Sequence, residues 1–247
     1  MKRYVILIVI AIAVVGCTAT PLSNPTSARD YHDRGLVYAD RGDLDRAIAD
    51  FDQAIQLQPD FAEAYYDRGL AYGHKGDLDR AMADWDQAIQ LKSDYAEAYY
   101  NRGIAYAAKG NYSRAITDFD KAVQLNPDDT DTYLSRGSAY ADKGDFDHAI
   151  TDLDKAIQLQ PDLAEAYYDR GLAYGHTNDL DHAIADFDKA IQLKPDFAEA
   201  YSNRAFAYNL KGEDEKATAD FKKVLELSND PSVRQHAEEY LKNLGIQ

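Results

Sequence analysis

Apolar and polar residues follow one another along most of this chain with the period of an α-helix. Between residues 59 and 92, residues that could form a buried stripe fall three or four positions apart in two sets: Tyr65, Gly69 and Tyr72, then Ala81, Trp85, Ala88 and Ile89. Residues at this spacing share one face of a helix. The stretch therefore predicts two amphipathic helices joined by a short turn.

The helix pair recurs at a fixed step along the chain. A tyrosine stands at the same place in every copy, as Tyr31, Tyr65, Tyr99, Tyr133, Tyr167 and Tyr201, always 34 residues apart. The copies span residues 28–61, 62–95, 96–129, 130–163, 164–197 and 198–229. A constant step of this size is typical of stacked helical hairpins, each of which needs its neighbours to complete a core.

Each copy also carries residues typical of helix ends. The turn residue is Gly42, Gly76, Gly110, Gly144 or Gly212, with Asn178 in the fifth copy. Glycine and asparagine tolerate positive φ best, so this position predicts a left-handed residue. Asp43, Asp77, Asp145 and Asp179 follow it and suit the N-cap of the second helix. Proline at 59, 127, 161 and 195 cannot continue that helix.

The first helix of each copy is expected to begin with a reciprocal capping pair. Asp60 with Glu63 has the required spacing, which recurs as Asp94 with Glu97, Asp162 with Glu165 and Asp196 with Glu199. Ser27 with Asp30 has the same spacing and predicts that the first helix begins at Ala28.

These residues resemble the tetratricopeptide repeat. The family pattern appears as Tyr65-x-x-Arg68-Gly69-x-x-Tyr72, followed by an alanine at 81 and an aromatic residue at 85. The resemblance implies an all-α, right-handed α-solenoid of six tandem 34-residue helix-turn-helix repeats over residues 28–229. It also implies a capping helix within residues 230–247, where Pro231 opens a stripe formed by Val233, Ala237, Tyr240, Leu241 and Leu244.

One departure from the family pattern is systematic. Arginine replaces the usual leucine in all six copies, as Arg34, Arg68, Arg102, Arg136, Arg170 and Arg204. An aspartate recurs as strictly on the second helix, as Asp50, Asp84, Asp118, Asp152, Asp186 and Asp220. We expect each arginine to pair with an aspartate of its own or the adjoining hairpin, because an unpaired guanidinium is costly to bury. The alternative is a ladder of arginines that binds an acidic ligand.

Residues 1–16 resemble a bacterial lipoprotein signal peptide. Lys2 and Arg3 precede an uncharged stretch of twelve residues, which is too short for a membrane-spanning helix of roughly 20 residues. Val14-Val15-Gly16 leads into Cys17, the chain's only cysteine. The resemblance implies that Cys17 is lipidated and becomes the new N-terminus. The alternatives are an uncleaved anchor helix or an ordinary signal peptide with a chance cysteine.

This resemblance predicts where the protein works. Residues 17–27 would form the lipid anchor and a flexible tether, since Thr, Ser, Asn and Pro predominate there. The protein would be a membrane-anchored lipoprotein on the extracytoplasmic face. In a Gram-negative host, the absence of aspartate after Cys17 favours the outer membrane, facing the periplasm. The sequence alone leaves inner and outer membrane open.

Charge restricts the classes of partner. The chain has 27 basic and 43 acidic residues, a net charge of −16. Such a surface repels nucleic-acid phosphates and anionic lipids, so the expected membrane contact is through the lipid anchor only. Protein or peptide segments with apolar and basic residues are the expected partners. The alternative is that the charge only maintains solubility.

In the tetratricopeptide family, the first helices line a concave groove. Carried over by position, the resemblance implies a partner-binding groove formed by Tyr66, Asp67, Leu70, His74, Tyr100, Asn101, Ile104, Tyr168, Asp169, Leu172 and His176. Tyrosine is a good contact residue because it loses little rotamer entropy. The alternative is that the tyrosines only pack between neighbouring first helices. Residues 59–92 and 161–194 differ at seven of 34 positions, so some of these matches could reflect copying of a block.

The sequence gives no support for catalysis. None of the six histidines forms the close helical pair of a zinc hydrolase, and the glycines occupy turn and packing positions of the repeat. We therefore expect no enzyme activity, metal, cofactor or small-molecule substrate. Two functions remain. One is a scaffold or adaptor that recruits proteins at the cell envelope, and the other is a pilotin-like assembly factor for an outer-membrane secretion or pilus complex.

Overall fold

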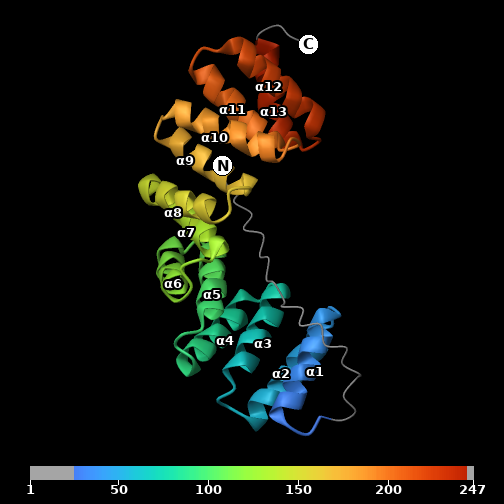
Figure 1. Cartoon of the computed structure of the whole chain (residues 1–247). Coiled ribbons are helices and arrows are strands. Elements are labelled where there is room, and N and C mark those ends of the chain that lie inside the picture. The colour runs from blue at the N-terminus through green and yellow to red at the C-terminus, as the bar shows by residue number, and fades with distance from the viewer. Residues whose placement is uncertain (1–24, 244–247) are drawn as a thin grey trace. The chain divides into compact units, whose positions relative to one another are not determined.

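The computed structural model describes residues 25–243, and these form helices and short connections without a strand. Cysteine 17, the predicted signal peptide and most of the predicted tether lie outside the described residues. The chain divides into two compact units, Met1–Pro127 and Asp128–Gln247. Within each unit, helical hairpins follow one another along the chain (Figure 1).

The first unit contains three helical hairpins. Its helices are α1 Ala28–Asp40, α2 Leu44–Leu57, α3 Ala62–His74, α4 Leu78–Leu91, α5 Ala96–Ala108 and α6 Tyr112–Leu125. Each first helix packs against its own second helix, and each second helix also packs against the next first helix. The predicted stacking of hairpins is therefore confirmed within this unit.

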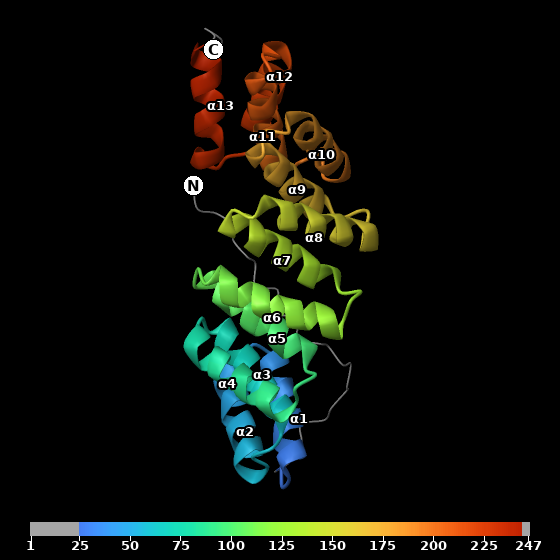
Figure 2. The ribbon, with the colours of Figure 1, turned by 90° about the vertical axis from the view of Figure 1, so that its left-hand side faces the viewer.

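The second unit contains three further hairpins and a final helix. Its helices are α7 Thr130–Lys143, α8 Phe146–Leu159, α9 Ala164–His176, α10 Leu180–Leu193, α11 Ala198–Leu210, α12 Asp214–Leu227 and α13 Pro231–Asn243. The predicted capping helix is α13, which packs on α12 and α11 (Figure 2). Its Ala237 and Leu241 are buried beside Phe221 and Val224, whereas Leu244 and Gly245 lie outside the described residues.

The turns have the predicted backbone. All five turn glycines have positive φ, and Asn178 has a φ of 62° in their place. Asp43, Asp77, Asp145 and Asp179 cap the second helices by accepting a bond from the backbone N–H three residues on. Ser27 and Asp30 form the expected capping box of α1.

The capping pairs expected for the later first helices are wrong. The N-cap of α3 is Phe61 rather than Asp60, and no side chain caps the helix. Tyr95, Leu163 and Phe197 hold the same place in α5, α9 and α11. Phe61 is buried, with its ring 4.8 Å from His32, so packing of an apolar residue fixes where the helix begins. Tertiary burial outweighs the weaker preference for a polar cap.

In four of the six first helices, α1, α3, α5 and α9, a glycine allows close contact with an aromatic ring of the second helix. A Cβ added to Gly69 would lie 2.6 Å from the Trp85 side chain, and one added to Gly103 would lie 2.7 Å from Phe119. The Trp85 indole N–H donates to the Tyr66 carbonyl at 3.3 Å, which holds the ring in place. The recurrent glycine is therefore required by packing within the hairpin.

The recurrent arginines pair with aspartates, as expected. Arg102 donates two hydrogen bonds to Asp118 of its own hairpin, at 2.8 and 2.6 Å, and one to Asp86 of the preceding hairpin at 2.5 Å. Arg68, Arg170 and Arg204 make the same three bonds in their copies. Asp118 is only 4% exposed, so these bonds compensate a buried charge.

We predict that Arg102→Leu lowers the free energy of unfolding by about 3–5 kcal/mol, because Asp118 would remain buried without a cation. The double variant Arg102→Leu, Asp118→Leu should recover much of the loss, since it removes the uncompensated charge. Arg46 lies in the exposed first turn of α2 and pairs with Asp43. Arg46→Leu should therefore lower the free energy of unfolding by no more than about 1 kcal/mol. Urea unfolding followed by circular dichroism measures all three, and equal effects of the two single substitutions would contradict the prediction.

Candidate partner-binding face

The predicted groove residues lie on three first helices, at equivalent positions of the repeat. Residues of α3 and α5 fall in the first unit, and those of α9 in the second. One stripe of α9 is formed by Glu165 and by the residues four, seven and eleven positions after it, which are Asp169, Leu172 and His176. The structure thus brings the residues of α3 and α5 together in one unit and places those of α9 in the other.

Two of the tyrosines tie neighbouring first helices together. Asn101 donates a hydrogen bond from Nδ2 to the Tyr66 hydroxyl at 3.0 Å, and Asn203 donates to the Tyr168 hydroxyl at 3.1 Å. The Tyr66 ring lies 4.7 Å from that of Tyr95, and burial raises the Tyr66 pKa. Both tyrosines are half-buried. Packing between helices therefore occupies much of each ring, as the alternative interpretation expected, and leaves part of it accessible.

Asp67 is also engaged in the contact between hairpins. Its Oδ2 lies 2.7 Å from Nε2 of His32, which is 9% exposed and packs beside Phe51 and Phe61. The partners are separated by 35 residues, the same separation as in the Tyr66–Asn101 and Tyr168–Asn203 bonds. The sequence analysis did not predict these pairs. They could have been found by looking for polar residues 35 positions apart, because in all three pairs the partners have this separation.

The aliphatic residues of the predicted groove differ in accessibility. Leu70 is 6% exposed and packs against Trp85 and Ala105, so it belongs to the hydrophobic core. Ile104 is 4% exposed. Leu172 is half-buried. Leu70 and Ile104 are therefore not available for contact with a partner, because neighbouring elements already cover these two side chains.

The histidines of the predicted groove lie at the ends of α3 and α9 and are exposed. The His176 ring stacks on Phe146 with 4.7 Å between ring centroids and 6° between planes. Tyr100 is half-buried, with its ring 5.9 Å from that of Phe119.

Asp169 differs from Asp67, which holds the same position of the repeat and pairs with His32, because no cation pairs with Asp169 among residues 25–243. Its Oδ2 accepts one hydrogen bond, from the Ser138 hydroxyl of α7 at 3.3 Å. Burial raises its pKa to about 7, and the nearby charges of Glu165 and Asp142 act in the same direction. Leu134 stands where His32 stands opposite Asp67, so the donor present in the first unit is missing here.

Two exposed apolar residues on α11 were missed by sequence reasoning. Phe206 is 54% exposed and Leu210 is 57% exposed. They lie on the stripe that Glu199 and Asn203 begin, at the positions that Leu172 and His176 occupy on α9. The signal was present in the sequence, since the sixth copy has Phe and Leu at the ninth and thirteenth positions of the repeat.

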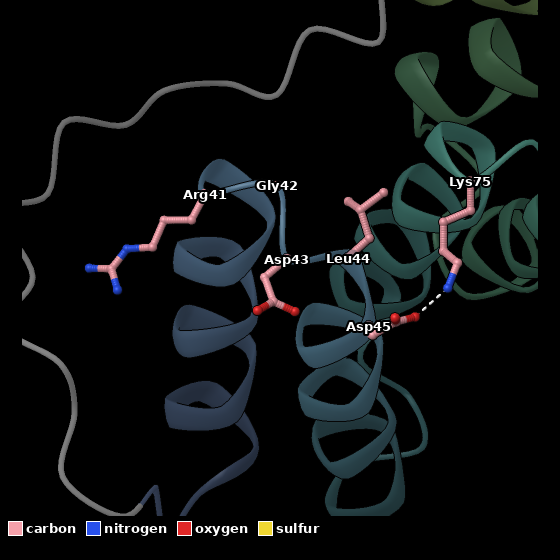
Figure 3. A pocket seen from close by; sticks show the side chains of 6 residues that line it. All are labelled: Arg41, Gly42, Asp43, Leu44, Asp45 and Lys75. Carbon is pink, nitrogen blue, oxygen red and sulfur yellow. Dashed lines mark hydrogen bonds and ion pairs between the residues drawn. The ribbon is translucent and has the colours of Figure 1, made fainter.

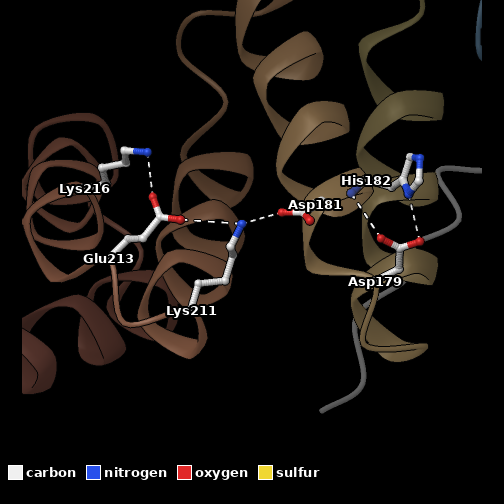
Figure 4. A network of polar contacts seen from close by, with 6 residues as sticks. All are labelled: Asp179, Asp181, His182, Lys211, Glu213 and Lys216. Carbon is white, nitrogen blue, oxygen red and sulfur yellow. Dashed lines mark hydrogen bonds and ion pairs between the residues drawn. The ribbon is translucent and has the colours of Figure 1, made fainter.

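Open hollows lie beside the turns, and in two of them a lysine bonds to an aspartate of the preceding hairpin. One is lined by Arg41, Gly42, Asp43, Leu44, Asp45 and Lys75, with Lys75 bonded to Asp45 of the preceding hairpin (Figure 3). In the second unit, Lys211 joins Asp181 to Glu213, which also accepts from Lys216 (Figure 4). The Lys75–Asp45 and Lys211–Asp181 pairs therefore link adjacent hairpins.

Within residues 25–243, no three histidine, cysteine or acidic side chains are placed to hold a metal ion. None of the described helices is both long enough and apolar enough to cross a membrane.

We predict that Asp169→Asn stabilises the protein, and more so as the pH rises. Because the folded-state pKa of Asp169 lies above the unfolded value, its ionisation lowers stability progressively between about pH 4 and pH 7. Removing the charge should therefore raise Tm at about pH 8, equivalent to roughly 1–2 kcal/mol for a half-buried group, and change it little at about pH 4.

Asp67→Asn is the matched control, because Asp67 has His32 as its hydrogen-bonding partner. It should give no gain at either pH. Thermal unfolding monitored by circular dichroism at the two pH values makes the comparison. A gain at Asp169 that is independent of pH, or the same gain at Asp67, would refute the assignment of an uncompensated carboxylate.

Solved structures with the same architecture include proteins from several bacteria. YrrB, described as a TPR protein with an unusual peptide-binding site, is 27% identical, with a TM-score of 0.67 over 76% of this chain and 97% of that one. MamA from Desulfovibrio magneticus RS-1 is 28% identical, with a TM-score of 0.66 over 68% of this chain and 97% of that one.

Pseudomonas aeruginosa PilF is 17% identical, with a TM-score of 0.72 over 86% of this chain and 97% of that one, a likeness of fold alone. A comparison with curated protein sequences gives no significant match.

Sequence models of the repeat match most of the described chain. The model described as TPR repeat matches residues 35–76, 74–110 and 137–177. Models described as tetratricopeptide repeat match residues 96–129, 164–197 and 198–231. Together with the stacked hairpins, the positive-φ turns and the solved structures of the same architecture, these matches show that the chain belongs to the tetratricopeptide-repeat family.

Proposed function

We propose that this protein is a non-catalytic scaffold that holds segments of partner proteins at the bacterial cell envelope. The observation that carries the proposal is the composition of the first-helix stripes, where partly accessible tyrosines and carboxylates lie beside exposed apolar residues. Aromatic and apolar side chains on a rigid helical framework supply contact area at a low cost in entropy. The peptide-binding site named for YrrB, at 27% identity, supports the same class of function.

Charge selects among the segments that such a surface would bind. The net charge of −16 favours basic or neutral polypeptides and disfavours nucleic acids and anionic lipid surfaces. The six recurrent arginines do not change this balance at the first helices, since each is bonded to an aspartate of a second helix. The partners proposed are therefore proteins or peptides with apolar and basic residues.

The proposed anchor is a lipid on Cys17, which follows an apolar segment and a basic start in the sequence. The mature protein would be held on the extracytoplasmic face, on the outer membrane facing the periplasm if the host is Gram-negative. More than one acyl chain is needed for stable anchoring, and lipoprotein modification supplies them.

The alternative is a pilotin-like assembly factor for a secretion or pilus complex in the outer membrane. The fold likeness to PilF motivates it, because the alignment covers most of both chains. The two functions use the same framework and differ in the partner.

We predict that Cys17→Ser abolishes lipidation and releases the protein from the membrane fraction. Cells that express the full chain are labelled with an alkyne analogue of palmitate, and label and fractionation are then compared. Thr18→Ala is the control, because it leaves the cysteine and the apolar segment unchanged and should keep both the label and the location. Membrane association of an unlabelled Cys17→Ser protein would contradict the lipid anchor.

We predict that partners contact the first helices in cells. A photo-crosslinking amino acid placed at Tyr100 or Tyr168 should give discrete adducts in the envelope, whereas one at Leu57, which is 54% exposed on second helix α2, should not. Mass spectrometry of the adducts separates the two functions, since a cell-wall hydrolase supports the adaptor and a multimeric channel subunit supports the assembly factor. Adducts from Leu57 alone would reject binding at the first helices.

A further inference from the structure

The second unit carries an uncovered apolar pair on a first helix. Four large hydrophobic side chains are exposed among the described residues, and two of them, Phe206 and Leu210, lie one turn apart on the same stripe of α11. The other two, Leu57 and Leu91, stand singly at the ends of second helices α2 and α4. In the second copy, Leu70 holds the position that Phe206 holds in the sixth, and Leu70 is only 6% exposed. Exposure of this pair is therefore a local feature of α11 and not a property of the repeat.

The stripes of α7, α9 and α11 form one continuous face. The Ser138–Asp169 hydrogen bond joins the stripe of α7 to that of α9, and the Tyr168–Asn203 bond joins α9 to α11. Phe206 and Leu210 lie three and seven residues after Asn203, so the apolar pair continues the same stripe of α11. We call the part of this surface formed by α9 and α11 the α9–α11 face, and define it by Glu165, Asp169, Leu172, His176, Glu199, Phe206 and Leu210.

Three carboxylates, those of Glu165, Asp169 and Glu199, lie on the α9–α11 face, and the only basic side chain in its definition is the His176 imidazole, which stacks on Phe146. Arg170 and Arg204 belong to the same helices, but both are bonded to aspartates of second helices. Lys211, just beyond α11, is bonded to Asp181. Asp169 has no cation partner among residues 25–243, and its pKa of about 7 reflects the cost of this charge in the free protein. A cation supplied from outside would relieve that cost.

We propose that the α9–α11 face binds a polypeptide segment of a partner protein in which two bulky apolar residues insert beside Phe206 and Leu210 and a lysine or arginine pairs with Asp169. This inference rests on the proposed function and identifies where, and through which chemistry, the partner is held.

The geometry restricts the segment. Neighbouring helix axes lie roughly 8–10 Å apart. Phe206 and Leu210 also lie three and seven residues beyond Asn203, which holds the repeat position of Asp169, so a rise of ~1.5 Å per residue places them roughly 10–14 Å from Asp169. A basic residue about seven to nine positions from the apolar residues of a helical segment spans that distance.

A second copy of this chain is a poorer occupant. Pairing two identical faces would bring together the carboxylates at 165, 169 and 199 of each copy. Arg170 and Arg204, which are the only arginine or lysine residues within α9 and α11, could not compensate them because both are bonded to aspartates of second helices. A basic and apolar segment complements both the charge and the exposed apolar pair.

The test selects binders without assuming a partner. A phage-displayed library of random 16-residue peptides is panned on the full-length protein in detergent micelles, and enriched peptides are synthesised for fluorescence anisotropy. We expect enriched peptides to carry two large apolar residues and a lysine or arginine. The Phe206→Ala, Leu210→Ala variant should bind them at least about tenfold more weakly, as expected for loss of central apolar contacts.

Leu57→Ala, Leu91→Ala is the matched control, because it removes the other two exposed leucines, and it should leave affinity unchanged. Asp169→Asn should weaken binding by about threefold to tenfold at low salt, with a smaller effect at roughly 0.5 M salt. The same substitution is expected to raise Tm, so weaker binding by a more stable protein would separate a contact with the ligand from a structural role.

Each other outcome counts against the inference in a distinguishable way. Enriched peptides whose affinity is unchanged by Phe206→Ala, Leu210→Ala would overturn the α9–α11 face while leaving the proposed peptide-binding function intact. Failure to enrich any peptide would count against both. A dimer in sedimentation velocity that is lost in the Phe206→Ala, Leu210→Ala variant would assign the face to a second copy and overturn the partner proposed here.

Discussion

The structure depends on a buried carboxylate on each second helix and the arginine that compensates it. A carboxylate such as Asp118 is almost fully buried, and the guanidinium of Arg102 satisfies both its oxygens while also reaching Asp86 of the preceding hairpin. One arginine therefore links three helices. Because a guanidinium bonds carboxylates in a fixed fork, this link restricts how neighbouring hairpins can slide or rotate against each other.

The polar contacts between first helices explain which predicted groove residues remain available to a partner. Asp67 and Asn101 are used within the framework by His32 and Tyr66, and Leu70 is covered by the next hairpin. Where the fourth copy supplies Leu134 instead of a hydrogen-bonding residue, the contact is incomplete and Asp169 keeps an uncompensated charge. Departures from the repeat thus locate the candidate binding surface better than the repeated residues do.

The helices, their order and their turns could be predicted from the sequence, because each follows from local rules. Apolar spacing places the two helices of every copy, and positive φ at the turn requires glycine or asparagine at positions such as 76 and 178. The Arg–Asp pairs were predictable too, since a charge that recurs in every copy needs a partner that recurs with it. The capping pair at Asp60 was wrong because burial of Phe61 decided where α3 begins.

The sequence by itself thus determined the family, the presence of a helix pair in every copy, the net charge of the chain and the residues that occupy the first-helix stripes. Only the tertiary structure decided which of those side chains are accessible. Leu70 and Phe206 hold the same position of the repeat, yet one is buried and the other is half exposed. The physical reason is that exposure depends on the neighbouring hairpin or capping helix packed against each residue, and a residue's own sequence context does not specify that neighbour.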